Sequence, residues 1–115
     1  MPERGLMVDV VEKISQYSPD KVVFTKKDLL SWLEERNKSS LEQLRKDLFN
    51  FNQLVHVEKQ EVEYGPLIEE RYRCYFIFTQ NRGRCYVIKF NHQIKVITAF
   101  PLGRTTLKRY RRKFK

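Results

Sequence analysis

The residues of this chain best suited to chemistry are cations and hydroxyl-bearing side chains near its C-terminal end. Lys95 and Thr98 lie in one apolar stretch, and Arg104 and Tyr110 follow shortly after it. RNA carries its own nucleophile in the 2′-hydroxyl group, so a cleavage site needs only groups that position a phosphate, stabilise the charge building on it and move protons. These four residues are therefore candidate catalytic residues of a metal-independent ribonuclease. Phosphate binding without cleavage is the alternative interpretation.

Charge is divided unevenly along the chain. The sequence has 23 Lys and Arg residues against 14 Asp and Glu residues, which gives a formal net charge of +9. Every acidic residue precedes position 71, and residues 71–115 hold 13 of the cations. A segment without carboxylates suits the binding of a polyanion, because nothing near in sequence neutralises its charge. We expect nucleic acid as the partner, RNA before DNA, with an anionic protein or a merely solvated surface as the alternatives.

Aromatic residues are interleaved with these cations. Phosphate contacts and stacking on aromatic rings are the two interactions that hold single-stranded RNA on a protein. Packing of the tyrosines beneath extended cationic side chains is the alternative. The candidate nucleic-acid-binding residues are Arg71, Arg73, Tyr75, Arg84, Lys108, Arg109, Arg111 and Arg112.

Few residues suit a metal or a cofactor, and we expect neither. Cys74 and Cys85 have no zinc-ligand spacing, and no carboxylate forms an obvious relay with either histidine, His56 or His92. Two-metal nuclease chemistry needs Asp and Glu to hold Mg²⁺, and residues 71–115 have none. We interpret the two cysteines as reduced core thiols, with a cross-strand disulfide as the alternative.

Hydrophobic periodicity predicts the elements that must position these groups. Helical spacing of apolar residues predicts three helices, over about residues 7–17, 26–36 and 40–51. After residue 52 the period changes to two, and β-branched and aromatic residues become common. Four strands are predicted, over residues 54–64, 67–79, 84–90 and 94–100. Their short connections require antiparallel neighbours, so we expect an α+β fold of three N-terminal helices packed on a four-stranded antiparallel β-meander.

The length of 115 residues suits one domain and is too short for two separate cores. An acidic helical part, residues 1–52, precedes the sheet at 53–100 and a basic tail at 101–115 that we expect to become helical on binding. Alternation along the second strand places Arg71 and Arg73 on one face, and the face toward the helices holds Tyr72, Cys74, Phe76 and Phe78.

The sequence has no run of about 18 apolar residues that would span a bilayer, and its first residues lack the pattern of a signal peptide. We therefore expect a cytoplasmic protein with no membrane partner.

The last predicted strand reads Ile94-Lys95-Val96-Ile97-Thr98-Ala99-Phe100-Pro101 and leads into the basic tail. Helices followed by such a sheet resemble the barnase/RelE-like ribonuclease toxins, whose members often end with an Ile-Thr-Ala-aromatic-Pro stretch. The resemblance covers about residues 54–115 and implies RNA cleavage by 2′-hydroxyl attack without metal. Arg104 and Tyr110 match the Arg and Tyr that follow the final strand in the RelE branch. The RelE branch also has basic residues on its middle strands, and Arg71, Arg73 and Arg84 would match these. The resemblance also implies an antitoxin as a protein partner.

A second resemblance, over residues 6–60, is to a winged-helix domain. It implies a non-enzymatic DNA-binding transcription regulator. The residues that would face the major groove are Ser39, Ser40, Gln43, Arg45 and Lys46. Glu42 and Asp47 lie beside these cations and oppose an approach to duplex phosphate. An accessory subunit of a nucleoprotein complex, anchored by its tail, is a third interpretation. The sequence leaves the oligomeric state open.

Overall fold

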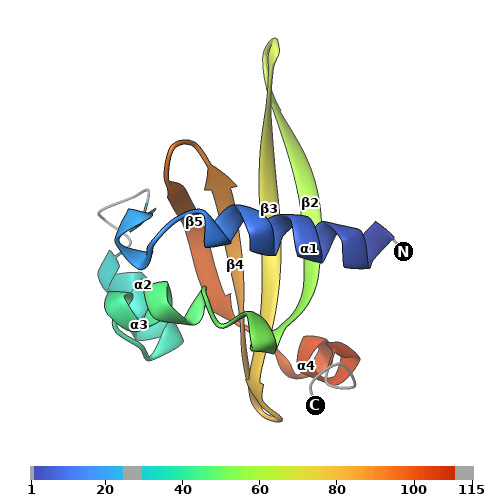
Figure 1. Ribbon diagram of the computed structural model, residues 1–115. Helices are drawn as coiled ribbons and strands as arrows, with labels where there is room; N and C mark the ends of the chain where they lie inside the picture. Colours follow the sequence, from blue (N-terminus) through green and yellow to red (C-terminus); the bar gives the residue numbers. More distant parts are fainter. Residues whose placement is uncertain (1, 25–29, 111–115) are drawn as a thin grey trace.

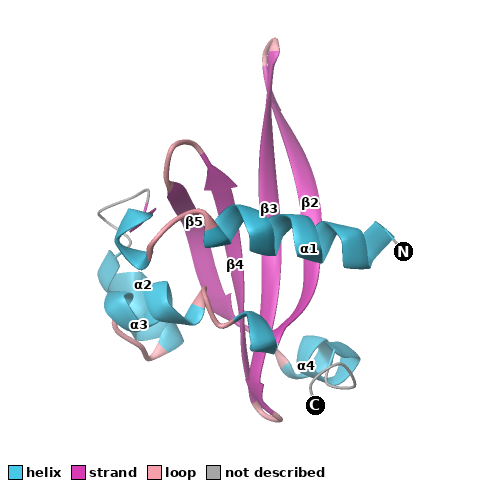
Figure 2. Ribbon diagram, in the orientation of Figure 1, coloured by secondary structure: helices cyan, strands magenta, loops and turns pink. Residues whose placement is uncertain are grey.

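The computed structural model describes residues 2–24 and 30–110, which form an α+β fold of four α-helices and a five-stranded mixed sheet (Figures 1 and 2). The α-helices are α1 (Pro2–Ser15), α2 (Leu30–Asn37), α3 (Leu41–Asp47) and α4 (Arg104–Tyr110). The strands are β1 (Val22–Phe24), β2 (Leu54–Tyr64), β3 (Leu67–Thr79), β4 (Arg82–Phe90) and β5 (Ile94–Pro101). Short 3₁₀ turns occupy Pro19–Lys21 and Phe51–Gln53.

The sheet has the strand order β1-β5-β4-β3-β2. Strands β2 to β5 form the expected antiparallel meander, and β2 and β3 have the predicted bounds. The expected four-stranded, wholly antiparallel sheet is nevertheless wrong in one respect, because β1 pairs in parallel with β5, with Val22 opposite Ile94. A strand of three residues is too short to show an alternating pattern in the sequence.

The helices differ from the prediction at their ends. Helix α1 begins at Pro2, earlier than expected; proline suits this first turn because its N–H would have no helical partner there. Helix α3 ends at Asp47 instead of continuing to residue 51. The start of the second predicted helix, at 26–29, lies outside the described residues. Within the tail, expected to become helical on binding, residues 104–110 form α4. No described helix is long and apolar enough to span a membrane.

The main core lies between the sheet and α1. Figure 1 shows α1 running across β2 and β3, with α2 and α3 beyond one of its ends. Val10 and Ile14 of α1 are fully buried in one cluster with Tyr72 and Phe76 of β3, on the predicted face of that strand. Helix α3 is joined to β4 by the Tyr86 hydroxyl group, which donates to the Leu44 carbonyl oxygen at 2.7 Å.

A smaller core on the opposite face holds α4. Leu107 and Tyr110, one turn apart, pack with Tyr75 and Cys85. Helix α4 can approach this closely because residue 83 is glycine. A Cβ atom on Gly83 would lie 2.7 Å from the Phe76 carbonyl oxygen, 2.8 Å from Leu102 Cδ1 and 3.0 Å from Leu107 Cδ2. The second core therefore fixes α4 at the end of β2 and β3 that lies away from their hairpin turn (Figure 1).

The two cysteines point to opposite faces of the sheet. Cys74 lies opposite Tyr86 across the strands, and Cys85 lies opposite Tyr75. Because neighbouring positions along a strand alternate between faces, the two sulfur atoms cannot meet in a disulfide. Both are free and buried, so the interpretation as reduced core thiols is confirmed.

Candidate nucleic-acid interface

The sheet face opposite α1 brings side chains from four strands into rows, because residues directly opposite each other in antiparallel strands share a face. The first row, beneath α4, is His56, Tyr75, Cys85 and Phe100. The second row is Glu58, Arg73, Val87 and Thr98. The third contains the pairs Gln60 with Arg71 and Lys89 with Lys95. No residue of the second or third row belongs to either of the two core clusters. We call these two rows the open face.

Four cations meet on the open face. Two of them share one carboxylate: Glu69 accepts hydrogen bonds from Lys89 Nζ at 2.7 Å and from Arg71 Nε at 2.6 Å. These two bonds, that of Lys89 first, hold the pKa of Glu69 below its ordinary value. The other two, Arg73 and Lys95, form no salt bridge with a described residue. The open face therefore keeps positive charge that its own carboxylates do not neutralise.

Glu58 lies where the first row meets the second. Its Oε1 atom accepts a hydrogen bond from the Tyr75 hydroxyl group at 3.0 Å, and its Oε2 atom lies 3.3 Å from His56 Nε2. The side chain is 44% exposed, so the carboxylate is accessible to a ligand. Arg73 is the direct cross-strand partner of Glu58, and its buried Nε atom has no hydrogen-bond partner among the described residues. A carboxylate, an imidazole, a phenol and a guanidinium group are thus gathered at one point.

This group was not predicted, and the expectation that no carboxylate forms a relay with His56 is wrong, because Glu58 lies beside it. The available signal was strand alternation, which places His56 and Glu58 two residues apart on one face. Their alignment with Tyr75 and Arg73 depends on the register of β2 against β3. That register runs without a shift from Tyr64 opposite Leu67 to His56 opposite Tyr75, and the β-bulge lies beyond it, between Leu54 and His56. The two-residue connection at 65–66 therefore indicated this alignment as well.

Tyr75 and Tyr110 are packed residues and do not present open rings. The Tyr110 ring stacks on the His56 ring with centroids 4.8 Å apart, and lies 5.4 Å from the Tyr75 ring. Each tyrosine is less than a tenth exposed. Burial, with smaller effects from Cys85 and the hydrogen bond to Glu58, raises the pKa of Tyr75 to about 12, although Arg73 opposes the change. The Tyr75 hydroxyl group is therefore a proton-bearing donor near neutral pH.

The four catalytic candidates do not form one site. Lys95 and Thr98 lie on β5, whereas Tyr110 packs on the first row beside β2 and β3. Glu58 and Thr98 occupy opposite ends of the second row, about 14 Å apart, because three strand spacings of about 4.8 Å separate them. Lys95 and Thr98 can therefore contact a bound strand, but they cannot act on the same phosphate as Glu58.

Helix α4 adds exposed cations beside the first row. Arg104, Lys108 and Arg109 are exposed, while Leu107 and Tyr110 face the sheet. The helix has no acidic residue to pair with them. The candidates Arg111 and Arg112 lie outside the described residues.

Arg84, expected to bind nucleic acid, lies on the other side of the sheet. Its cross-strand partner is Phe76, so it faces the helices and is only 3% exposed. Its guanidinium group donates to Asp47 Oδ2 at 2.8 Å and to the Tyr86 hydroxyl oxygen at 3.0 Å. We correct the expectation accordingly: Arg84 joins α3 to the sheet and is not part of the open face.

The residues of the winged-helix interpretation are largely used within the fold. Ser40 caps α3 by accepting from the Gln43 backbone N–H at 3.1 Å. Arg45 Nε donates to the Val22 carbonyl oxygen at 3.0 Å. The Lys46 Nζ atom lies 3.5 Å from Glu42 Oε1. Helix α3 is seven residues long. Ser40, Gln43 and Lys46 are nevertheless exposed, so the DNA-binding interpretation stays a prediction.

Comparison with known proteins identifies no relative of this chain. No protein-family model, curated protein or solved structure matches the chain.

Proposed function

We propose that this protein binds single-stranded RNA across the open face and along α4. One observation supports the proposal above the others: cations of β3, β4 and β5 share one sheet face, and α4 adds exposed cations at its border. Arg73 and Lys95 lie on different strands of this face, so together they can contact more than one phosphate of an extended strand.

We further propose that the group around Glu58 cleaves this RNA without a metal. Glu58 would take the proton of a 2′-hydroxyl group, whose oxygen then attacks the adjacent phosphorus atom. Arg73 and the Tyr75 hydroxyl group would stabilise the negative charge on the phosphoryl oxygens. As the bond from phosphorus to the 5′ oxygen breaks, the proton taken up by Glu58 would pass to that oxygen through the His56 imidazole, whose Nε2 atom lies 3.3 Å from Glu58 Oε2. The products are a 2′,3′-cyclic phosphate and a free 5′-hydroxyl group.

The same proposal includes the resemblance of residues 54–115 to the barnase/RelE-like ribonuclease toxins. The antiparallel meander of β2 to β5 and the basic helix after it agree with that resemblance. The catalytic role falls on Glu58 in place of Lys95, Thr98, Arg104 and Tyr110. An antitoxin protein would then be the natural partner.

A cleavage assay with a matched pair of variants tests the enzymatic step. Labelled single-stranded RNA is incubated in EDTA with the wild-type protein, with Glu58→Gln and with Glu61→Gln, which alters an exposed residue on the other face of β2. Wild type and Glu61→Gln should cleave, and Glu58→Gln should lose roughly 10²–10⁴-fold in rate while still binding. A salt-sensitive gel shift of the wild type without cleavage would remove the enzymatic step and leave an RNA-binding protein.

A further inference from the structure

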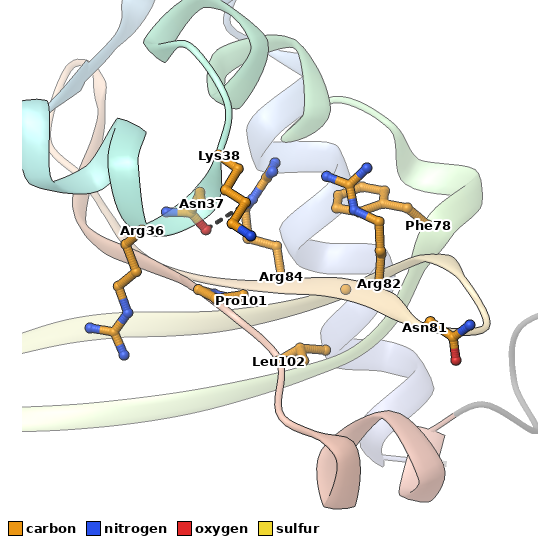
Figure 3. Close-up of a pocket in the computed structure, with 10 residues that line it drawn as sticks. Arg36, Asn37, Lys38, Phe78, Asn81, Arg82, Arg84, Pro101 and Leu102 are labelled. Carbon is orange, nitrogen blue, oxygen red and sulfur yellow. Dashed lines mark hydrogen bonds between the residues drawn. The ribbon is translucent and has the colours of Figure 1, made fainter.

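A second basic site lies away from the open face, between the C-terminal end of α2 and the β3–β4 hairpin. It is a pocket of about 440 Å³, shown in Figure 3 with its lining side chains. Arg36, Lys38, Arg82 and Arg84 are among the ten described residues that line it, and none of those ten is acidic. A hollow with four cations and no carboxylate in its lining attracts small anions.

The walls of this pocket are fixed before any ligand binds. Asn37 Nδ2 donates to the Leu33 carbonyl oxygen at 2.9 Å and to the Ala99 carbonyl oxygen at 3.1 Å, which joins the end of α2 to β5. Asn37 Oδ1 accepts a hydrogen bond from Arg84 Nε at 3.3 Å, the dashed line in Figure 3. The Arg84 guanidinium group is thereby held at the floor of the pocket, and a ligand would not have to order it.

Two of the cations that line the pocket, Lys38 and Arg82, have no carboxylate partner in the described part of the fold. Arg84 is paired with Asp47, but Lys38 and Arg82 are exposed and form no salt bridge with a described residue. Lys38 has a φ of 52°, in the left-handed region where glycine is the easiest residue to place. This φ belongs to the end of α2, where the Ser39 N–H donates to the Glu34 carbonyl oxygen at 3.2 Å and closes the helix. The feature of Lys38 that favours a bound anion is its exposed ammonium group, which has no carboxylate partner among the described residues.

A neighbouring cavity extends the site toward Gln53. It measures about 420 Å³ and shares Lys38, Phe78, Arg82 and Arg84 with the first pocket. Asp47 also lines this second cavity, where its carboxylate is paired with Arg84, so the charge available to an anion is that of Lys38 and Arg82. Gln53 lines this second part, and its Oε1 atom is buried with no hydrogen-bond partner among the described residues. An acceptor without a donor suits a ligand that brings an N–H or O–H group next to its anionic group.

We propose that this site binds a phosphate group of a nucleotide, with the phosphate between Lys38 and Arg82 and a hydrogen-bond donor of the base or sugar directed at Gln53. The nucleotide is either free or part of an RNA strand; the second case rests on the proposed function, and the first does not.

Calorimetric titration with adenosine 5′-monophosphate, inorganic phosphate and adenosine tests the site without RNA. We expect the wild-type protein to bind the monophosphate more tightly than inorganic phosphate, and adenosine not at all. The variant Lys38→Gln/Arg82→Gln should bind the monophosphate at least tenfold more weakly. The matched control Lys21→Gln/Lys46→Gln removes two exposed cations elsewhere and should bind as the wild type does. Equal affinity of the wild type and the Lys38/Arg82 variant, or an equal loss in the control, would overturn the proposal.

A second comparison identifies the source of the phosphate. Short oligouridine strands with and without a 5′-phosphate are titrated into the wild type and into Lys38→Gln/Arg82→Gln. If the wild type binds the 5′-phosphorylated strand more tightly than the other strand, and the variant binds both alike, the site holds a strand end. If the variant loses affinity equally for both strands, the site holds backbone phosphates. Oligouridine binding that is unchanged in the variant, together with weakened binding of the monophosphate, assigns the site to free nucleotides. Cleavage in EDTA is measured separately with Glu58→Gln, so this proposal and the ribonuclease proposal can fail independently.

Discussion

At the scale of single residues, burial decides the protonation of the side chains beneath α4. It raises the pKa of Tyr75 from 10.0 to about 12, and that of Cys85 from 9.0 to about 12. Above about pH 9 the folded protein therefore holds protons that the unfolded chain releases. This contribution to the free energy of unfolding is complete below pH 9 and is lost as the pH rises toward 12. The urea midpoint should be lower at about pH 10.5 than at about pH 8, and an equal or higher midpoint would contradict this assignment.

A second prediction for a single side chain concerns Asp47, which pairs with the buried Arg84 at 2.8 Å. Replacing Asp47 by alanine leaves a buried guanidinium charge without its counter-ion, which costs about 3–5 kcal/mol. Glu42 on the same helix is the control. Its pair with Lys46 is exposed, so Glu42→Ala should change the free energy of unfolding by less than about 1 kcal/mol. Urea unfolding of the two variants measures the difference, and similar costs would show that Arg84 does not depend on Asp47.

Some residues of the candidate site were predictable from the sequence, and others were not. Alternation along a strand correctly separated Arg71 and Arg73 from the residues that pack on the helices. It cannot say which residue of the next strand lies opposite. The two-residue connection at 65–66 does so for Glu58 and Arg73. A β-bulge between Ile77 and Thr79 shifts the register of β3 against β4, and that shift places Arg84 on the side of the helices. Faces are therefore predictable within a strand, whereas a site built across four strands is not.

At the scale of elements, α4 is held by one close approach. Replacing Gly83 by alanine places a methyl group 2.7 Å from the Phe76 carbonyl oxygen and 2.8 Å from Leu102 Cδ1. Backbone cannot yield as a flexible side chain does, so we expect a loss of about 1–3 kcal/mol in the free energy of unfolding. Gly103→Ser is the control, because a Cβ atom there meets nothing within 4 Å. Serine also suits the N-cap of α4, where the Gly103 carbonyl oxygen accepts from the Leu107 N–H. Denaturant titration should separate the two variants, and equal stability would show that α4 shifts freely.

The elements with long periodic patterns were predictable, and the short ones were not. Strands β2 and β3, of 11 and 13 residues, begin and end where the sequence indicated. Strand β1 has three residues and pairs with β5, far along the chain, so no local pattern reports it. The helical state of α4 depends on the packing of Leu107 and Tyr110 against the sheet, which is a tertiary contact.

At the scale of the whole molecule, the two ends of the sheet carry opposite charge. Near the β2–β3 turn, Glu61 and Glu63 are exposed and form no salt bridge with a described residue, whereas Glu69 and Glu70 are paired with Arg71, Lys89 and Lys59. Exposed Arg104, Lys108 and Arg109 surround the other end on α4. An RNA strand is therefore expected to approach from the α4 end and to follow the open face from there.

The most direct test of the central claim is the affinity for labelled single-stranded RNA of two double variants measured side by side. Arg73→Gln/Lys95→Gln removes two charges from the open face, and Lys21→Gln/Lys46→Gln removes two exposed charges from the helical part. Charge-assisted contacts contribute about 1.5–3 kcal/mol each, so the open-face variant should bind at least roughly tenfold more weakly, and the other variant as the wild type does. Equal affinities, or a larger loss in Lys21→Gln/Lys46→Gln, would contradict the assignment of the open face as the RNA-binding surface.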